Sequence, residues 1–266
     1  MSPELVYHLN LLWVGFGIGV LVGLTGVGGG ALMTPILILF FRIPPSIAVG
    51  TDLVNAAFMK SVGAFQHWRQ GTVKFRIVTA LAMGSIPAAV LGVGVVKYLK
   101  EMMGNVGEDA LTVFLAWTLI LVASIMIVRL VLSRRKKAKG ERQPHPMHKH
   151  RMLLTVILGI AAGILVSLTS IGAGSIVMVF LVALYSASAK RLVGTDIVHA
   201  ALLAIVSAIG HVWAGNVDFG VAGMLLMGSL PGVLLGSRLT VRMPDLLLRI
   251  VLALTLMFSG MRLMVR

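Results

Sequence analysis

The sequence contains no cysteine and few charged residues, and each shortage excludes a class of protein. Without cysteine there is no disulfide, no thiol catalysis and no cysteine-ligated metal site. Charged residues make up 12% of the chain, about half the share that is usual in a soluble domain. Hydrophobic residues are abundant instead, at 58%, and the mean hydropathy is +0.99. The 266 residues therefore suit a bundle of membrane spans, with little left for a separate soluble domain.

The formal charge of +14 comes from 23 Lys and Arg against nine Asp and Glu. Its distribution argues against nucleic-acid binding, because the basic residues lie between apolar stretches instead of forming one face. The first ten residues contain no basic cluster, so we expect 11–22 to belong to the first span and not to a cleavable signal peptide.

A duplication organises the chain. Residues 23–92 recur at 167–236 with a constant offset of 144 and 25 identities in 70 positions. The sequence Val-Gly-Thr-Asp occurs at 49–52 and again at 193–196, and Met-Gly-Ser occurs before the matching prolines Pro87 and Pro231, where we expect kinks. Duplicated membrane units that are interrupted by glycine are typical of secondary transporters, whose substrate site lies between the copies.

Ten apolar stretches predict an all-α membrane protein with five segments in each repeat. The second segment of each repeat is too short to cross the bilayer, since twelve helical residues extend only about 18 Å. Each follows a glycine cluster, so we expect a broken helix that turns back inside the membrane as a half-helix. The stretches are 5–24, 31–42, 47–66, 75–98, 111–132, 152–168, 175–186, 191–212, 219–240 and 246–264.

Loop charges predict the orientation. The loops near 69–76, 133–151, 187–191 and 238–242 carry most of the cations, so they should be cytoplasmic and both termini outside. Five segments per repeat and the exchange of charge between matching loops together predict inverted topology. We therefore expect a first repeat at 1–132, a basic cytoplasmic linker at 133–151 and a second, inverted repeat at 152–266.

The glycine clusters are candidates for an anion site. A half-helix that begins at a glycine presents unpaired N–H groups and a positive dipole end, and the missing side chains allow close approach. Close helix packing is the main alternative, whereas a dinucleotide-binding fold would need a preceding strand that the sequence does not have. The candidate residues are Thr25, Gly26, Gly28, Gly29 and Gly30 in the first copy, and Thr169, Ser170, Gly172, Gly174 and Ser175 in the second.

Polar residues inside apolar stretches form a second set of candidates. Asp52 and Asn55 share a helix face, as do Asp196 and His199, and Thr51 and Thr195 precede the two aspartates. Ionisable groups at membrane depth usually face a partner or a wet cavity, although the aspartates could instead cap their helices. Lys60 could contact an anion, pair with Asp52 or extend to the interface.

Histidines provide the third set. His67 and His211 match across the duplication and titrate near neutral pH, which makes them candidates for proton coupling. Hydrogen bonding at the membrane interface is the alternative. His145, His148 and His150 lie among cations, which opposes metal binding and favours a solvated linker.

These motifs resemble the TauE/SafE family of sulfite exporters. The resemblance lies in the glycine-rich segments 23–30 and 167–174, the two Val-Gly-Thr-Asp segments, and His-x-x-x-Gly at 67–71 and 211–215. It implies transport of small sulfur-containing anions across the bacterial cytoplasmic membrane, often with proton coupling. Ser170 and Ala173 replace two of the glycines in the second copy, which would alter one half of the site.

The sequence thus predicts a transporter of a small oxyanion, and not an enzyme. The resemblance implies that the anion contains sulfur, as in sulfite, thiosulfate or an organosulfonate, and that the protein exports it by alternating access. The bilayer and the anion are the expected partners, without nucleic acid, cofactor or bound metal. A divalent-cation transporter that uses Asp52, Asp196 and His199 is the runner-up, and a receptor or intramembrane enzyme is a third class. The sequence leaves open whether the chain forms a homodimer.

Overall fold

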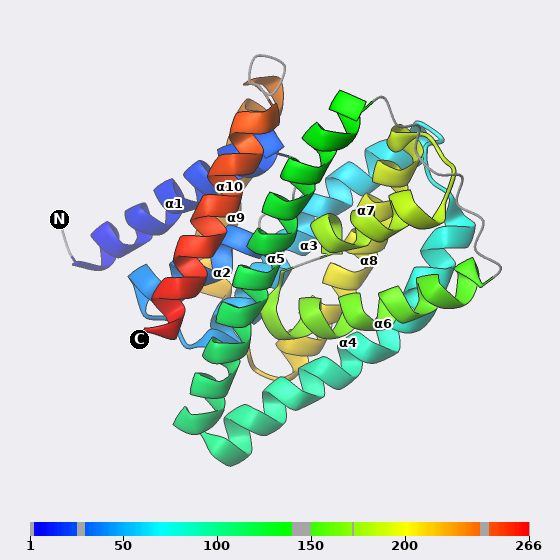
Figure 1. Cartoon of the computed structure of the whole chain (residues 1–266). Helices are drawn as coiled ribbons and strands as arrows, with labels where there is room; N and C mark the ends of the chain where they lie inside the picture. The colour runs from blue at the N-terminus through cyan, green and yellow to red at the C-terminus, as the bar shows by residue number, and fades with distance from the viewer. Residues whose placement is uncertain (1–2, 26–29, 140–149, 172, 240–244, 266) are drawn as a thin grey trace.

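The computed structural model describes residues 3–25, 30–139, 150–171, 173–239 and 245–265. This part of the chain folds into ten α-helices without a strand, which confirms the all-α prediction (Figure 1). The helices are α1 (Pro3–Thr25), α2 (Gly30–Phe41), α3 (Pro45–Arg69), α4 (Phe75–Met103), α5 (Asn105–Lys139), α6 (Arg151–Thr169), α7 (Ala173–Leu184), α8 (Ala189–Trp213), α9 (Phe219–Leu239) and α10 (Asp245–Met264).

Six of the described helices are long and apolar enough to span a membrane, namely α1, α4, α5, α6, α8 and α9. The chain is therefore a multi-pass membrane protein. Helix α5 continues to Lys139, beyond the boundary that the sequence placed at 132. Lysine and arginine favour helix, and cations stabilise a helix C-terminus, so the basic segment continues the helix beyond its candidate span, which ends at Val128.

Helices α2 and α7 are twelve residues long, as predicted, and each returns to the end of the molecule where the preceding helix began. The ring of Tyr7, near the start of α1, lies 5.6 Å from that of Phe41 at the end of α2. At the matching positions of the second repeat, the Arg151 guanidinium lies 5.8 Å from the Tyr185 ring. Each repeat thus opens with a long helix followed by a short one that goes back.

The two repeats exchange their first helices. Helix α1 of the first repeat packs along α9 of the second, and α6 of the second packs along α4 of the first, while α3 pairs with α8 and α5 with α10. Glycines permit the close contacts: a Cβ at Gly19 would lie 2.4 Å from the Ser229 carbonyl oxygen, and one at Gly163 would lie 2.3 Å from that of Ser85. These two contacts match at the offset of 144, which is the relation that a two-fold axis between the repeats produces.

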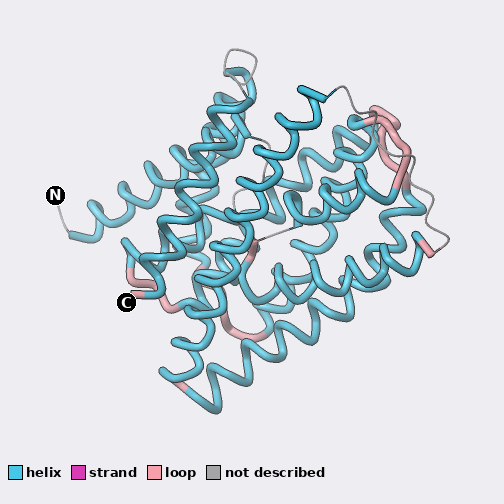
Figure 2. Tube along the Cα trace, in the orientation of Figure 1, coloured by secondary structure: helices cyan, strands magenta, loops and turns pink. Residues whose placement is uncertain are grey.

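The loops gather at two ends of the bundle (Figure 2). At the first end, where α1 begins, Lys100 donates to the Asn216 side chain at 2.7 Å, and Glu108 accepts from the Ser46 backbone at 2.9 Å. At the second end, the backbone N–H of Lys74 donates to Thr195 Oγ1 at 3.0 Å. The structure thus groups the loops after α3 and before α8 together, as the charge pattern predicts. Which end is cytoplasmic stays a prediction.

Single cysteines can identify the cytoplasmic end, because the natural chain has no cysteine. We expect Gln70→Cys and Ser188→Cys, both exposed at the second end, to react with a membrane-impermeant maleimide only after cells are permeabilised. Met102→Cys, 71% exposed at the first end, should react in intact cells. Labelling of Ser188→Cys and Met102→Cys from the same side would contradict the inverted arrangement.

Candidate functional site

The predicted polar residues meet where helices of the two repeats cross. Helices α3 and α8 have 25 residues each, or about 37 Å, and Asn55 and His199 lie two residues from their midpoints. Ser229 of α9 donates to Asn55 Oδ1 at 2.9 Å, and Ser85 of α4 lies 2.9 Å from His199 Nε2. These two pairs match at the offset of 144, so each repeat supplies a serine to the buried helix of the other.

Asp52 is completely buried on the same face of α3 as Asn55. Thr34, one turn into the half-helix α2, donates to Asp52 Oδ2 at 2.7 Å, and Ser170 lies close enough to interact with the same carboxyl group. The other oxygen, Oδ1, finds no hydrogen-bond partner in the described part of the chain. Asp52 therefore joins α3 to a half-helix and is not only a helix cap.

Lys60 is the cation of this cluster. Its partly exposed side chain interacts electrostatically with Asp52, Asp196 and His199. The one ion pair within 4 Å among the described residues joins Lys97 to Glu101, which leaves the Lys60 ammonium and the aspartates apart at longer range. The counterpart of Lys60 in the second repeat is Ala204, so the site is chemically asymmetric.

Several buried polar atoms of the cluster lack a partner within the described chain. They are a carboxylate oxygen of each aspartate, the Asn55 amide nitrogen and the second ring nitrogen of His199. Buried polar groups are nearly always hydrogen-bonded in folded proteins, so these atoms point to a bound ligand or water. Donors and acceptors are both present, and the arrangement suits binding of a small polar solute and movement of a proton.

The two threonines of the Val-Gly-Thr-Asp segments contact loops of the opposite repeat, and their predicted contact with a substrate stays a prediction. Thr51 Oγ1 accepts the backbone N–H of Asp218 at 3.0 Å, just as Thr195 Oγ1 accepts that of Lys74. Each threonine therefore holds the loop before α9 or α4 of the other repeat. Both threonines are buried and directly precede Asp52 and Asp196, so each contact connects a loop to the helical turn that carries an aspartate of the cluster.

His67 and His211 also lie toward the ends. His67 Nδ1 is 2.9 Å from the Thr72 hydroxyl, and buried His211 Nε2 donates to the Ser167 carbonyl at 2.9 Å. Each histidine packs beside the Val-Gly-Thr-Asp segment of the other repeat, since a Cβ at Gly50 would lie 3.1 Å from His211 Cβ and one at Gly194 would lie 3.0 Å from His67 Nδ1. In the described part of the chain their printed hydrogen bonds go to Thr72 and Ser167 and not to an aspartate. A role in proton coupling stays a prediction.

The structure places the glycine-rich candidates only in part. Gly26, Gly28, Gly29 and Gly172 lie outside the described residues, as do the loop histidines His145 and His148. Thr25 ends α1, Gly30 begins α2, and Gly174 and Ser175 are in the first turn of α7. The Thr169 hydroxyl donates to the Leu165 carbonyl and accepts from the Ile171 N–H, so it closes the end of α6.

Sequence reasoning missed Thr34, Ser85 and Ser229. The two serines belong to the duplicated Met-Gly-Ser segments. The prolines of these segments were interpreted as kinks, but the duplication of the serines could also have indicated a shared role. The duplication could not have indicated Thr34, because the matching residue of the second repeat is Met178. In the described part of the chain, no group of three His, Asp or Glu side chains is placed to hold a metal ion.

Comparison with known proteins covers almost the whole chain. Residues 11–263 match the model of the family described as sulfite exporter TauE/SafE. Three proteins of Bacillus subtilis, all named probable membrane transporter proteins, are similar to it. YjnA is 42% identical over 96% of this chain and 99% of its own length, and YdhB is 29% identical over the same shares. YunE is 22% identical over 95% and 96% of the two chains. No solved structure matches. The chain therefore belongs to the TauE/SafE sulfite exporter family.

Proposed function

We propose that this protein exports a small sulfur-containing oxyanion, such as sulfite, thiosulfate or an organosulfonate, across the cytoplasmic membrane. The observation that carries the proposal is the buried cluster around Lys60, at mid-depth where the two repeats cross. Ionisable groups at such depth mark transport pathways. The family match and the names of the Bacillus subtilis relatives support the same class of function.

An oxyanion in this cluster needs donors, and the side chains supply them. The Lys60 ammonium carries a positive charge, while the Asn55 amide nitrogen and the free ring nitrogen of His199 can each donate to an oxygen. The half-helices α2 and α7 begin next to the glycine clusters, and a helix N-terminus stabilises a negative charge. We infer that the glycine-rich N-termini complete the cradle.

Asp52 and Asp196 would repel an anion if both were ionised with no compensation. Lys60 offsets one negative charge, and a proton on a carboxyl group offsets the other. Binding of the anion and a proton together would follow from this balance, and the cluster itself would then couple the two. Lys60 would also repel a divalent cation, so this balance of charges supports the anion over the runner-up substrate.

Alternating access requires two arrangements of the same contacts. The threonine–loop contacts at Thr51 and Thr195 lie at opposite ends and match at the offset of 144. One can open while the other stays closed, which would expose the central cluster to one side at a time. Inverted repeats in secondary transporters work in this way.

We therefore expect sulfite to stabilise the purified protein. We also expect the protein to release sulfite from loaded proteoliposomes. A ligand at 100 times its Kd adds about 2.7 kcal/mol to the free energy of unfolding, which raises Tm by several degrees. We would measure Tm in detergent against sulfite, thiosulfate, an alkylsulfonate, chloride, Mg²⁺ and Mn²⁺, and sulfite efflux from proteoliposomes. Stabilisation by the divalent cations and by none of the sulfur anions would contradict the proposal.

A further inference from the structure

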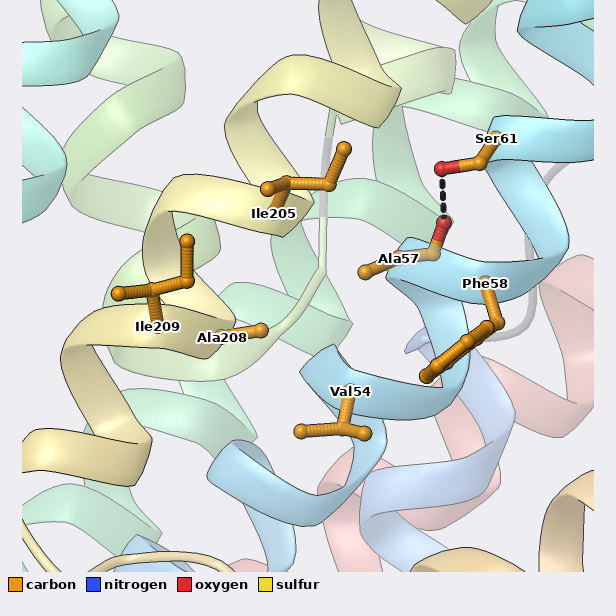
Figure 3. Close-up of a pocket in the computed structure, with 7 residues that line it drawn as sticks. All are labelled: Val54, Ala57, Phe58, Ser61, Ile205, Ala208 and Ile209. Atoms are coloured by element: carbon orange, nitrogen blue, oxygen red, sulfur yellow. Dashed lines mark hydrogen bonds between the residues drawn. The ribbon is translucent and has the colours of Figure 1, made fainter.

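An apolar groove of about 220 Å³ lies between α3 and α8. Figure 3 shows its side chains facing each other across the two helices. Phe58 and Ile209 at its rim are 59% and 55% exposed, so the groove opens toward the surface of the bundle. The lining residues are Val54, Ala57, Phe58, Ser61, Ile205, Ala208 and Ile209.

The lining of the groove offers no free hydrogen-bonding side chain to water or to a polar ligand. The Ser61 hydroxyl donates to the Ala57 carbonyl within its own helix, at 2.6 Å, so the one polar side chain in the lining is already satisfied. The groove is close to the midpoints of α3 and α8, and hence at the depth of the hydrocarbon core. An acyl chain or an apolar helix face is the only chemistry that fits it.

Exposed arginines lie on the groove side of both helices toward the second end. On α3, Phe58, Val62, Phe65 and Arg69 are spaced by four, three and four residues, and all four are exposed. The Arg69 guanidinium is 5.8 Å from the centre of the Phe65 ring, which keeps it over this face. On α8, Arg191 is 14 residues before Ile205, which is close to four full turns.

The dimensions match those of a phospholipid. Arg69 is twelve residues, or about 18 Å, from the midpoint of α3, and half of a hydrocarbon core is about 15 Å. The arginine heads therefore reach headgroup depth when the groove is in the hydrocarbon. Six of the cations at this end lie near the ends of α3, α4, α6 and α8, and none of these six forms an ion pair within 4 Å with another described residue. They are Arg69, Lys74, Arg76, Arg151, Lys190 and Arg191.

We propose that an anionic phospholipid binds here, with one acyl chain in the α3–α8 groove and its phosphate between Arg69 and Arg191. Charge complementarity selects this occupant over a second copy of the chain, which would bring the same six cations against each other. The site depends on the fold and not on the identity of the transported solute. It lies on the outer side of the two helices whose inner side carries Asp52, Lys60 and His199.

Native mass spectrometry of the full chain would test the site directly. The protein would be released from micelles that contain equal amounts of palmitoyl-oleoyl phosphatidylglycerol and the matching phosphatidylcholine. We expect the parent to retain one phosphatidylglycerol. The double variant Arg69→Gln with Arg191→Gln should retain roughly tenfold less, since each cation near a lipid surface contributes measurably to binding. Ala208→Phe, which fills the groove, should lose the lipid while both arginines stay.

Matched controls separate the site from general effects. Arg262→Gln removes an arginine that covers the Phe258 ring at 5.7 Å on another helix, and Leu234→Phe enlarges an exposed apolar residue of α9; both should retain the lipid. The Tm of each variant in phosphatidylcholine alone shows whether it is folded, and the arginine variants alter only exposed side chains.

Three outcomes would overturn the proposal. The first is equal retention of phosphatidylglycerol by the parent and the double arginine variant. The second is displacement of the lipid by inorganic phosphate, which would assign the arginines to a free anion and leave the groove unused. The third is a dimer mass in the parent that Ala208→Phe abolishes without a change in lipid retention, which would assign the groove to a second copy.

Discussion

Replacing Gly19 with leucine should prevent α1 from packing on α9 and should give a protein that cannot be purified in folded form. A Cβ at this position would lie 2.4 Å from the Ser229 carbonyl oxygen and 2.8 Å from its Cα. Both are backbone atoms, so no rotamer change relieves the contact. Overpacking usually costs about 1–3 kcal/mol, and we expect the upper end or more here, because two helices must separate along their length. The yield of monodisperse protein and its Tm measure the effect.

Gly17 provides the matched control on the same helix. A Cβ there meets nothing within 4 Å, so Gly17→Leu should leave Tm within about 1 °C of the parent value. Gly163→Leu is the repeat counterpart of Gly19→Leu and should be equally damaging, since its Cβ would lie 2.3 Å from the Ser85 carbonyl oxygen. If Gly19→Leu and Gly17→Leu had the same Tm, the exchange of helices between repeats would be wrong.

Replacing Lys60 with methionine should lower the affinity for sulfite by about 10- to 100-fold and abolish transport. A hydrogen bond to a charged group contributes about 1.5–3 kcal/mol, which corresponds to this range. Removal of the cation also leaves Asp52 and Asp196 without their shared positive neighbour. One negative charge would then stay uncompensated even with a proton on the other carboxyl group, and it would repel the anion. Sulfite affinity by calorimetry and efflux from proteoliposomes measure the two effects.

Lys97→Met is the control, because Lys97 is exposed and pairs only with Glu101 one turn away. An exposed pair contributes little to stability or binding, so sulfite affinity should not change. A salt series distinguishes contact from long-range attraction, since only the latter weakens strongly as the Debye length shortens. Unchanged affinity in Lys60→Met would remove Lys60 from the site.

The helices could be predicted from the sequence because a membrane span requires a long run of apolar residues. The short helices α2 and α7 were predicted for the same reason, together with their glycine-rich flanks. The extension of α5 to Lys139 was missed because apolar content marks where the membrane ends and not where the helix ends. The exchange of α1 and α6 between repeats carries no local signal, since packing between apolar helices depends on small residues spread over distant segments.

The sequence predicted the charged residues of the candidate site more fully than its serines and threonines. Asp52, Lys60 and Asp196 stand out in apolar sequence because burying a charge is costly. Threonines and serines do not, since a hydroxyl can satisfy itself on a carbonyl of its own helix, as Ser61 does. Thr51 and Thr195 were predicted by their position beside the aspartates; each hydroxyl accepts a backbone N–H of a loop, and a role in substrate binding stays a prediction.

The exchange of first helices sets the order in which the protein can be completed during synthesis. Helix α1 ends at Thr25, and its partner α9 begins at Phe219, 194 residues later. At about 5–20 residues per second, the ribosome needs roughly 10–40 s to make that segment. Throughout this interval the glycine-lined side of α1 has only lipid or another newly made helix against it, whereas α4 and α6 can pair as soon as α6 is inserted. The pair of α4 and α6 can therefore form well before α1 is covered by α9, although α1 is the first helix to be made.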